Sequence, residues 1–195
     1  MDAVPSNAGP SNAAPSNAAP LSAPIAEVVA SRLRDIPDFP IPGVGFKDFT
    51  PLLSDGPAFR AVVQNIASRY SGQVDVVVGI EARGFILGAA VAYELGIGFV
   101  PVRKEGKLPA ATHSAEYQLE YGSAVIEVHT DAFEAGARVL VMDDVLATGG
   151  TAEATCALVE RAGATVAAVE VVLELGFLHG RSKLTGRTVH AMLSV

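Results

Sequence analysis

Residues 139–151 read Val139-Leu140-Val141-Met142-Asp143-Asp144-Val145-Leu146-Ala147-Thr148-Gly149-Gly150-Thr151, which is the most informative stretch of this sequence. Its first four residues form an apolar, partly β-branched run that is typical of a buried parallel strand. The run ends in two acids and a turn of small residues, and a helical pattern follows over about 151–161. A strand, a tight turn and a helix in this order predict a βα unit of an α/β protein.

The turn over 147–151 is suited to binding a phosphate. Gly149 and Gly150 let the chain curl so that successive N–H groups converge at the start of a helix, where the helix dipole is positive. No lysine follows the glycines, so this is not the Gly-x-x-x-x-Gly-Lys nucleotide loop. The adjacent carboxylates of Asp143 and Asp144 instead suit the vicinal hydroxyls of a sugar whose 5′-phosphate occupies the turn.

The run from Val141 to Thr151 resembles the signature of the type I phosphoribosyltransferase family, and in particular that of its adenine-specific branch. The resemblance implies a mostly parallel central sheet flanked by helices, with a small hood and a flexible lid loop. It implies that Asp143 and Asp144 hold the ribose. It also implies that the 5′-phosphate is bound by Ala147, Thr148, Gly149, Gly150 and Thr151. A plain βα turn with an acidic edge, as any doubly wound protein has, is the alternative interpretation.

Composition limits the class of protein. The chain has 195 residues, enough for one domain with a sizeable core. Its net charge of −7 argues against a nucleic acid or a membrane surface as the main partner. No apolar run approaches the roughly 18 residues of a membrane-spanning helix. The single cysteine, Cys156, rules out an internal disulfide, and we expect it to be a core residue of a cytoplasmic protein.

Residues 5–20 repeat Pro-Ser-Asn-Ala with a proline at every fifth position. This spacing prevents a helix, and such small side chains bury too little area to offset the entropy of ordering. We therefore expect a disordered tail over 1–24, whose use as a tether stays open, and a single domain over 25–195. The tail has neither the basic start nor the apolar core of a signal peptide, so we do not expect one.

Hydrophobic periodicity predicts the remaining elements. Helices are expected over 25–33, 59–70, 85–95 and 151–161, and strands over 74–79, 98–102, 123–129, 165–173 and 188–193. The strands that begin near Val74 and Val139 both stop at a polar turn before a helix, so both turns should lie at the carboxyl edge of one sheet. We expect 36–51 and 103–122 to be irregular, and the strand over 123–129 to lie in or near the hood.

Residues 42–51, Pro-Gly-Val-Gly-Phe-Lys-Asp-Phe-Thr-Pro, resemble the hood of the adenine-specific branch. The resemblance implies that Phe46 stacks on the base and that the main chain around Gly45 reads its exocyclic amine. It also implies that Leu175 contacts the opposite face of the base, beside Gly176, which replaces the family's usual proline. Judged without the resemblance, this apolar segment is also interpretable as an arm packed on the core.

Two segments indicate a pyrophosphate site. Arg103, Lys104 and Lys107 place three cations within five residues of an acidic protein, and a solvated charged loop is the alternative. The stretch Ile80-Glu81-Ala82-Arg83-Gly84 resembles the family's pyrophosphate loop, which implies contacts from Glu81, Ala82 and Arg83.

The family's flexible lid loop resembles Arg-Lys-x-Gly-Lys-Leu-Pro from Arg103 and Tyr-x-Leu-Glu-Tyr-Gly from Tyr117. Long segments of this kind tend to be lids or binding loops. The resemblance places Tyr121 in the lid and gives Glu120 the task of handling a proton on the base.

Together these motifs imply transfer of phosphoribose from 5-phosphoribosyl 1-pyrophosphate to adenine, giving AMP and diphosphate. The catalytic residues implied are Glu120, Arg83, Asp143 and Asp144. The resemblance also implies a homodimer and a Mg²⁺ ion bridged by substrate and water. The four histidines lack metal-ligand spacing, so we expect no zinc site. Transfer to another purine base, or a catalytically silent protein that senses the activated sugar, stays open.

Overall fold

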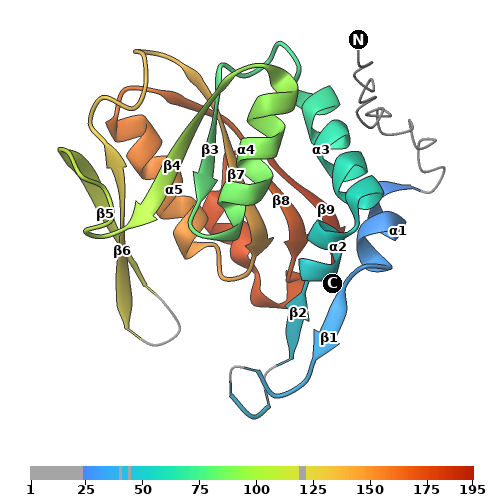
Figure 1. Ribbon diagram of the computed structural model, residues 1–195. Helices are drawn as coiled ribbons and strands as arrows, with labels where there is room; N and C mark the ends of the chain where they lie inside the picture. The colour runs from blue at the N-terminus through green and yellow to red at the C-terminus, as the bar shows by residue number, and fades with distance from the viewer. Residues whose placement is uncertain (1–23, 40, 44, 119–121) are drawn as a thin grey trace, which may run out of the picture.

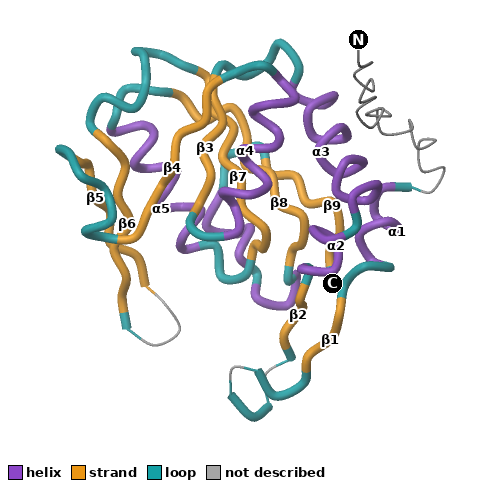
Figure 2. The backbone as a smooth tube through the Cα atoms, in the orientation of Figure 1, coloured by secondary structure: helices purple, strands orange, loops and turns teal. Residues whose placement is uncertain are grey.

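The computed structural model describes residues 24–39, 41–43, 45–118 and 122–195 (Figure 1). All but the last residue of the tail expected over 1–24 lies outside this range, so the disorder of the tail stays a prediction. The described chain is an α/β structure in which helices cover both faces of a central sheet, as the purple and orange segments of Figure 2 show.

Within the described residues, the central sheet has seven strands in the order β5-β6-β4-β3-β7-β8-β9. In that order they are Thr112–Gln118, Ser123–His129, Gly98–Lys104, Val76–Ile80, Arg138–Leu146, Thr165–Glu174 and Val189–Ser194. The strands β4, β3, β7, β8 and β9 are parallel, and β6 pairs antiparallel with β4 and β5. The mostly parallel sheet expected from the sequence is confirmed.

Helices bury both faces of this sheet. On one face, α3 (Gly56–Tyr70) and α4 (Arg83–Leu95) pack with Leu140 of β7. On the other face, α5 (Gly150–Arg161) packs with Val141 of the same strand. Both strand residues are fully buried. Because successive side chains of a strand point to opposite faces, a strand covered on both sides must be apolar throughout, which explains the continuous run at the start of β7.

A two-stranded ribbon, which we call the β1–β2 ribbon, precedes the sheet. It pairs β1 (Arg34–Ile36) antiparallel with β2 (Phe46–Asp48), between α1 (Ile25–Ala30) and α2 (Thr50–Ser54). Opposite charges face each other across it, since Arg34 and Lys47 form ion pairs with Asp48 and Asp35. The expectation of an irregular segment over 36–51 was therefore partly wrong, because pairing between short strands leaves little trace in local periodicity.

The segment after β4 also differs from expectation. Residues 112–118, predicted to be irregular, form β5, which pairs with β6 along its whole length. The strand β6 lies in the central sheet and contacts β4 through Arg103 opposite Glu127, rather than in or near the hood. These corrections share one cause: each strand is defined by partners that the local sequence does not reveal.

The other predicted elements are confirmed, with the short helix α2 and two short 3₁₀ turns added. Helices α1, α3, α4 and α5 match the four predicted ones, and η1 (Gly176–Leu178) and η2 (Gly180–Leu184) precede β9. Cys156 is a buried free thiol, as expected of a core residue. None of the helices in the described ranges has the length and apolar character needed to cross a membrane.

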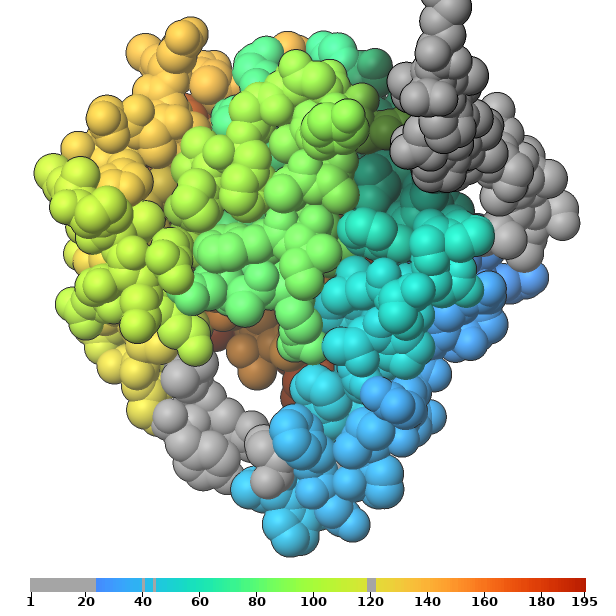
Figure 3. All heavy atoms as spheres, viewed as in Figure 1, coloured from blue at the N-terminus to red at the C-terminus, as the bar shows by residue number. Residues whose placement is uncertain are grey.

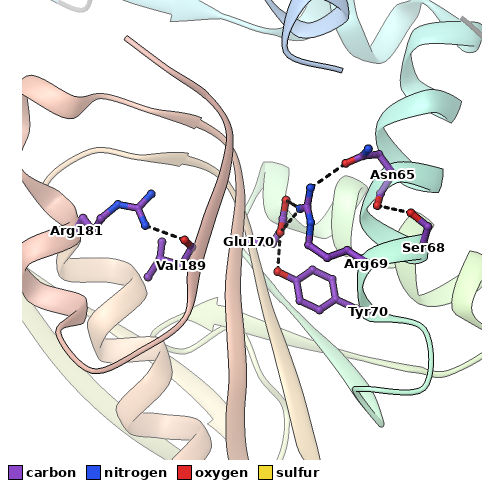
Figure 4. A network of polar contacts seen from close by, with 7 residues as sticks. All are labelled: Asn65, Ser68, Arg69, Tyr70, Glu170, Arg181 and Val189. Atoms are coloured by element: carbon purple, nitrogen blue, oxygen red, sulfur yellow. Dashed lines mark hydrogen bonds and ion pairs between the residues drawn. The ribbon is translucent and has the colours of Figure 1, made fainter. Parts of the chain in front are cut away.

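A buried polar network joins α3 to the middle of β8 (Figure 4). The fully buried Glu170 accepts hydrogen bonds from Arg69 at 2.7 and 2.8 Å and from the Tyr70 hydroxyl at 2.7 Å. Asn65 Oδ1 accepts a further bond from Arg69 at 3.0 Å. The pKa of Tyr70 is raised, mainly because the hydroxyl is buried and secondly because it donates a hydrogen bond to Glu170. The network satisfies an otherwise costly buried acid and fixes the orientation of α3 on the sheet.

Candidate active site at the carboxyl edge of the sheet

Two polar turns meet at the carboxyl edge of the sheet. Strands β3 and β7 pair in parallel with Val76 opposite Val139, so the turns that follow them are neighbours, as the sequence predicted. The β1–β2 ribbon projects from the same edge (Figure 1). In the space-filling view, a hollow opens between this blue ribbon and the green surface of the chain's middle part (Figure 3).

The turn after β7 forms the expected cradle of backbone N–H groups, which we call the phosphate turn (Ala147–Thr151). Gly149 has a φ of +78°, and α5 begins at Gly150. A Cβ atom on Gly149 would lie 2.2 Å from the carbonyl oxygen of Gly180, so this position requires glycine. The first N–H groups of α5 have no partner within the helix. They lie beside a cavity of about 70 Å³ lined by Asp143, residues 145–149, Thr151, Ala152 and Val171.

Asp143 lines this cavity, and its partner in the acid pair, Asp144, is the next residue of β7. Asp144 is buried, and its Oδ2 lies 2.9 Å from Arg83 Nη2. The approach lies off the N–H directions, so this oxygen has no aligned hydrogen bond among the described residues. Asp143 Oδ1 accepts the N–H of Asp144 at 2.9 Å. The pKa of Asp143 is raised well above its usual range, mainly because the group is buried and secondly because the Asp144 carboxylate repels a second negative charge. Such a pair has spare capacity for hydroxyl donors.

Arg83 connects the acid pair to the β1–β2 ribbon. It is the first residue of α4, and its guanidinium carbon lies 5.7 Å from the ring centre of Phe46 and 5.1 Å from that of Phe49. Phe39 meets Phe46 edge-on, with ring centres 5.1 Å apart. These contacts are typical of cation–π and aromatic pairs. The structure thus brings Arg83, Asp144 and Phe46 together from three separate segments.

The other side of the site is cationic and is organised by Glu81. Glu81 Oε2 accepts the backbone N–H of Lys104 at 2.9 Å, and Oε1 lies 3.3 Å from Arg103 Nη2. The pKa of Glu81 is lowered, chiefly because its carboxylate accepts the hydrogen bond from the backbone N–H of Lys104. Arg103 also donates to the carbonyl of Lys107 at 3.0 Å, while the side chains of Lys104 and Lys107 are exposed. Ala82 follows Glu81 through a cis peptide bond and is also exposed.

Gly45 and Leu175 flank two different strands: Gly45 directly precedes β2, and Leu175 directly follows β8. Gly45 is exposed and precedes β2, and a Cβ atom there would meet nothing within 4 Å. Leu175 is half-buried, and its N–H donates to the carbonyl of Leu146 at 2.9 Å. Gly176, the residue in place of the family's usual proline, donates its N–H to Val195 at 2.9 Å. A proline at position 176 would lack this N–H group, so the hydrogen bond from Gly176 to Val195 stabilises the turn in this chain.

Two expected residues cannot be placed, and others were missed. Glu120 and Tyr121 lie outside the described residues. Sequence reasoning missed Glu127, a buried acid that accepts the Gly106 N–H at 2.9 Å and the Thr112 hydroxyl at 3.3 Å. The sequence signal that could have revealed Glu127 is an acidic residue within a strand of alternating apolar and polar residues. Sequence reasoning also missed the contact between η2 and the phosphate turn, for which the sequence carries no local signal.

Comparison with known proteins identifies the family. A family model described as the phosphoribosyl transferase domain matches residues 53–183, which include both turns and the acid pair. The chain belongs to the phosphoribosyltransferase family. An adenine phosphoribosyltransferase of Salinispora tropica is 66% identical over 172 residues, which is 87% of this chain and 91% of the relative.

Solved structures of phosphoribosyltransferases agree with this assignment. The adenine phosphoribosyltransferase of Thermoanaerobacter pseudethanolicus has a TM-score of 0.83 and 48% identity, with 87% of this chain and 99% of that chain covered. The enzyme from Saccharomyces cerevisiae was solved in complex with adenine and an imino-altritol bisphosphate. It has a TM-score of 0.83 and 38% identity, and the match covers 87% of this chain and 98% of that chain. The type I phosphoribosyltransferase fold is therefore confirmed.

Proposed function

We propose that this phosphoribosyltransferase transfers the phosphoribosyl group of 5-phosphoribosyl 1-pyrophosphate to adenine, giving AMP and diphosphate. One observation carries the proposal: the phosphate turn, the acid pair and the Phe46 ring lie along a single edge, and Arg83 joins the last two. The high identity to enzymes named adenine phosphoribosyltransferases over most of the chain supports adenine as the base.

The sugar phosphate binds at the phosphate turn. Backbone N–H groups at the start of α5 and the hydroxyls of Thr148 and Thr151 donate to the 5′-phosphate, which gains from the positive end of the helix dipole. Asp143 and Asp144 accept hydrogen bonds from the ribose hydroxyls. Because both acids lie near the end of the rigid central strand β7, the sugar is held in one orientation for reaction.

The reaction breaks the bond between C1 of the ribose and the diphosphate oxygen, and the electron pair leaves with diphosphate. C1 gains positive charge that the acid pair stabilises, while Arg103, Lys104 and Lys107 stabilise the departing anion. A ring nitrogen of adenine then donates its electron pair to C1 and loses its proton. In this proposal Glu120, which lies outside the described residues, accepts that proton.

The base binds against the β1–β2 ribbon. Phe46 presents an aromatic ring that Phe39 supports from its edge and that Arg83 covers at 5.7 Å. Stacking on such a ring contributes on the order of 1–3 kcal/mol per base. The open space around Gly45 leaves its main chain accessible to the exocyclic amine, and Leu175 is assigned to the opposite face of the base.

We further propose Mg²⁺ as the cofactor. Among the described residues no group of three or more His, Cys, Asp or Glu side chains forms a metal site, so the ion would take most of its oxygen ligands from diphosphate and water. The carboxylates of Asp143 and Asp144 are the protein oxygens that fit it, and Asp144 Oδ2 faces Arg83 in an ion pair without an aligned hydrogen bond among the described residues. When bound, Mg²⁺ supplies neutralisation of the diphosphate charge.

A homodimer is also proposed. The outer face of α4 exposes two apolar side chains seven residues apart, Ile86 at 47% and Tyr93 at 88%, and α4 lies uncovered at the front of Figure 1. Replacing Tyr93 with Asp should shift the sedimentation coefficient from dimer to monomer, whereas an unchanged coefficient would place the interface elsewhere.

The cytoplasm stays the proposed compartment, on the basis of the single cysteine.

The function is tested by measuring diphosphate release with Mg²⁺ and 5-phosphoribosyl 1-pyrophosphate, with adenine, hypoxanthine, guanine, xanthine and orotate compared in parallel. Release with adenine alone supports the proposal. Release with a 6-oxopurine would mean that the base site at Gly45 and Phe46 is misassigned. Tight sugar binding without release would make the protein a sensor of the activated sugar.

A further inference from the structure

We propose that Lys183, in the 3₁₀ turn η2 near the C-terminus, binds the 5′-phosphate of the sugar substrate alongside the phosphate turn. The inference rests on the proposed function and adds a side-chain cation to a site that the sequence assigned to backbone and hydroxyl donors alone. It starts from the contact between η2 and the phosphate turn.

The two turns touch backbone to backbone. A Cβ atom on Gly180 would lie 2.1 Å from the carbonyl oxygen of Ala147 and 2.8 Å from the nitrogen of Gly149. The reciprocal contact, from Gly149 to the Gly180 carbonyl, is 2.2 Å. With glycine on both sides, η2 reaches a position that any side chain would block, and it packs directly against the backbone of the phosphate turn.

Lys183 places its ammonium group at the start of α5. Its Nζ lies 3.5 Å from the Cβ position of Gly150, the first residue of that helix. Lys183 is exposed, and it takes part in none of the ion pairs formed by the described residues. A cation is unfavourable at the positive end of a helix dipole. An anion that contacts both the ammonium group and the first N–H groups of the helix makes the arrangement favourable.

The other basic residues nearby are already engaged. Arg181 donates to both oxygens of the buried Glu174, at 3.0 and 2.5 Å, and to the carbonyl of Val189 at 2.7 Å, the contact drawn in Figure 4. Arg187 pairs with Glu160 at 2.6 Å. Buried Leu184 fixes the end of η2 in the core. The turn is thus anchored on both sides of Lys183, whose ammonium group forms no ion pair with the residues that the structure describes.

Charge supplies the reason for a cation here. A phosphate monoester carries about −1.5 to −2 charges near pH 7. It must bind next to Asp143 and Asp144 in a protein of net charge −7. One ammonium group at the phosphate offsets part of that repulsion, which the backbone dipoles must otherwise overcome alone.

The test uses the full chain and titration calorimetry with ribose 5-phosphate, and separately with Mg²⁺-diphosphate. Lys183→Met should weaken ribose 5-phosphate binding about tenfold, as expected for a charged hydrogen bond, and leave diphosphate binding within twofold. Lys183→Arg should retain most of the affinity. The matched control is Arg138→Met, which removes one positive charge at the opposite end of β7 and should leave both affinities unchanged.

Equal ribose 5-phosphate affinity in wild type and Lys183→Met would overturn the inference, and so would no binding by the wild type. An equal loss of ribose 5-phosphate and diphosphate binding would also overturn it, because it would indicate a general effect on charge or structure. The proposed function fails separately: it fails if the wild type binds ribose 5-phosphate but forms no AMP from adenine.

Discussion

Gly149 and Gly180 are interlocked, because each occupies the place that a side chain on the other would need. A Cβ atom on Gly149 would lie 2.2 Å from the Gly180 carbonyl oxygen, and one on Gly180 would lie 2.8 Å from the Gly149 nitrogen. One glycine belongs to the phosphate turn and the other begins η2, 31 positions later in the chain. The phosphate turn therefore owes its shape to a distant segment as well as to its own residues.

Replacing Gly149 with Ala should abolish most of the activity, because the new methyl group must displace the backbone of either η2 or the phosphate turn. We expect a loss of at least tenfold in ribose 5-phosphate affinity. Gly163→Ala is the matched control, since Gly163 also has a positive φ, of +85°, but a Cβ atom there would meet nothing within 4 Å. The control should lose only about 1 kcal/mol of stability. Equal phosphate affinity in Gly149→Ala and wild type would contradict the interlock.

Asp143→Asn should stabilise the folded protein while it lowers activity. An acid with a raised pKa in the folded state destabilises that state once the pH exceeds its unfolded pKa of about 4, because its ionisation is disfavoured by burial. Asparagine has no proton to lose. The gain in Tm should be near zero at about pH 3 and reach a few degrees at neutral pH. Thermal unfolding at several pH values measures it, and a gain that shrinks with rising pH would contradict this assignment.

Phe46→Ala should raise the KM for adenine about tenfold, because the stacking surface is lost. The KM for 5-phosphoribosyl 1-pyrophosphate should change less than threefold, since the sugar phosphate binds at the other end of the site. Steady-state kinetics with each substrate varied in turn separate the two effects. An equal rise in both constants would indicate that the β1–β2 ribbon had lost its structure.

Glu174→Gln and Arg181→Met should each weaken ribose 5-phosphate binding by severalfold, because each breaks the ion pair that holds η2 on β8. Arg181→Met also removes the bond to Val189 of β9. The double variant should lose little more than either single one, since both changes break the same contact. Full additivity in a double-mutant cycle would show that the two residues act separately.

Glu170→Ala should lower stability without changing the chemistry at the site. It removes the acceptor for Arg69 and Tyr70 and leaves the buried Tyr70 hydroxyl without a partner (Figure 4). We expect a loss of roughly 2–4 kcal/mol in the free energy of unfolding, measured in urea. The kcat of the folded fraction should stay unchanged, and a large fall in kcat would connect this network to the site.

The sequence predicted those parts of the fold that depend on local pattern. The buried run of β7, the phosphate turn and the helix of α5 all follow from adjacent residues, and so does the neighbouring turn at Glu81 and Arg83. The sequence could not predict what depends on distant pairing. Strand β5 exists because β6 pairs with it, and the β1–β2 ribbon because Arg34 and Asp48 face each other. Lys183 reaches Gly150 only through the close approach of Gly180 to the phosphate turn.

The most direct test of this account is a crystal structure of the complex with AMP. We predict the 5′-phosphate within hydrogen-bonding distance of the backbone N–H groups of Gly149–Thr151, the ribose hydroxyls on Asp143 and Asp144, and the adenine ring on Phe46. A nucleotide bound with its phosphate away from the phosphate turn, or with its base away from the β1–β2 ribbon, would contradict the account.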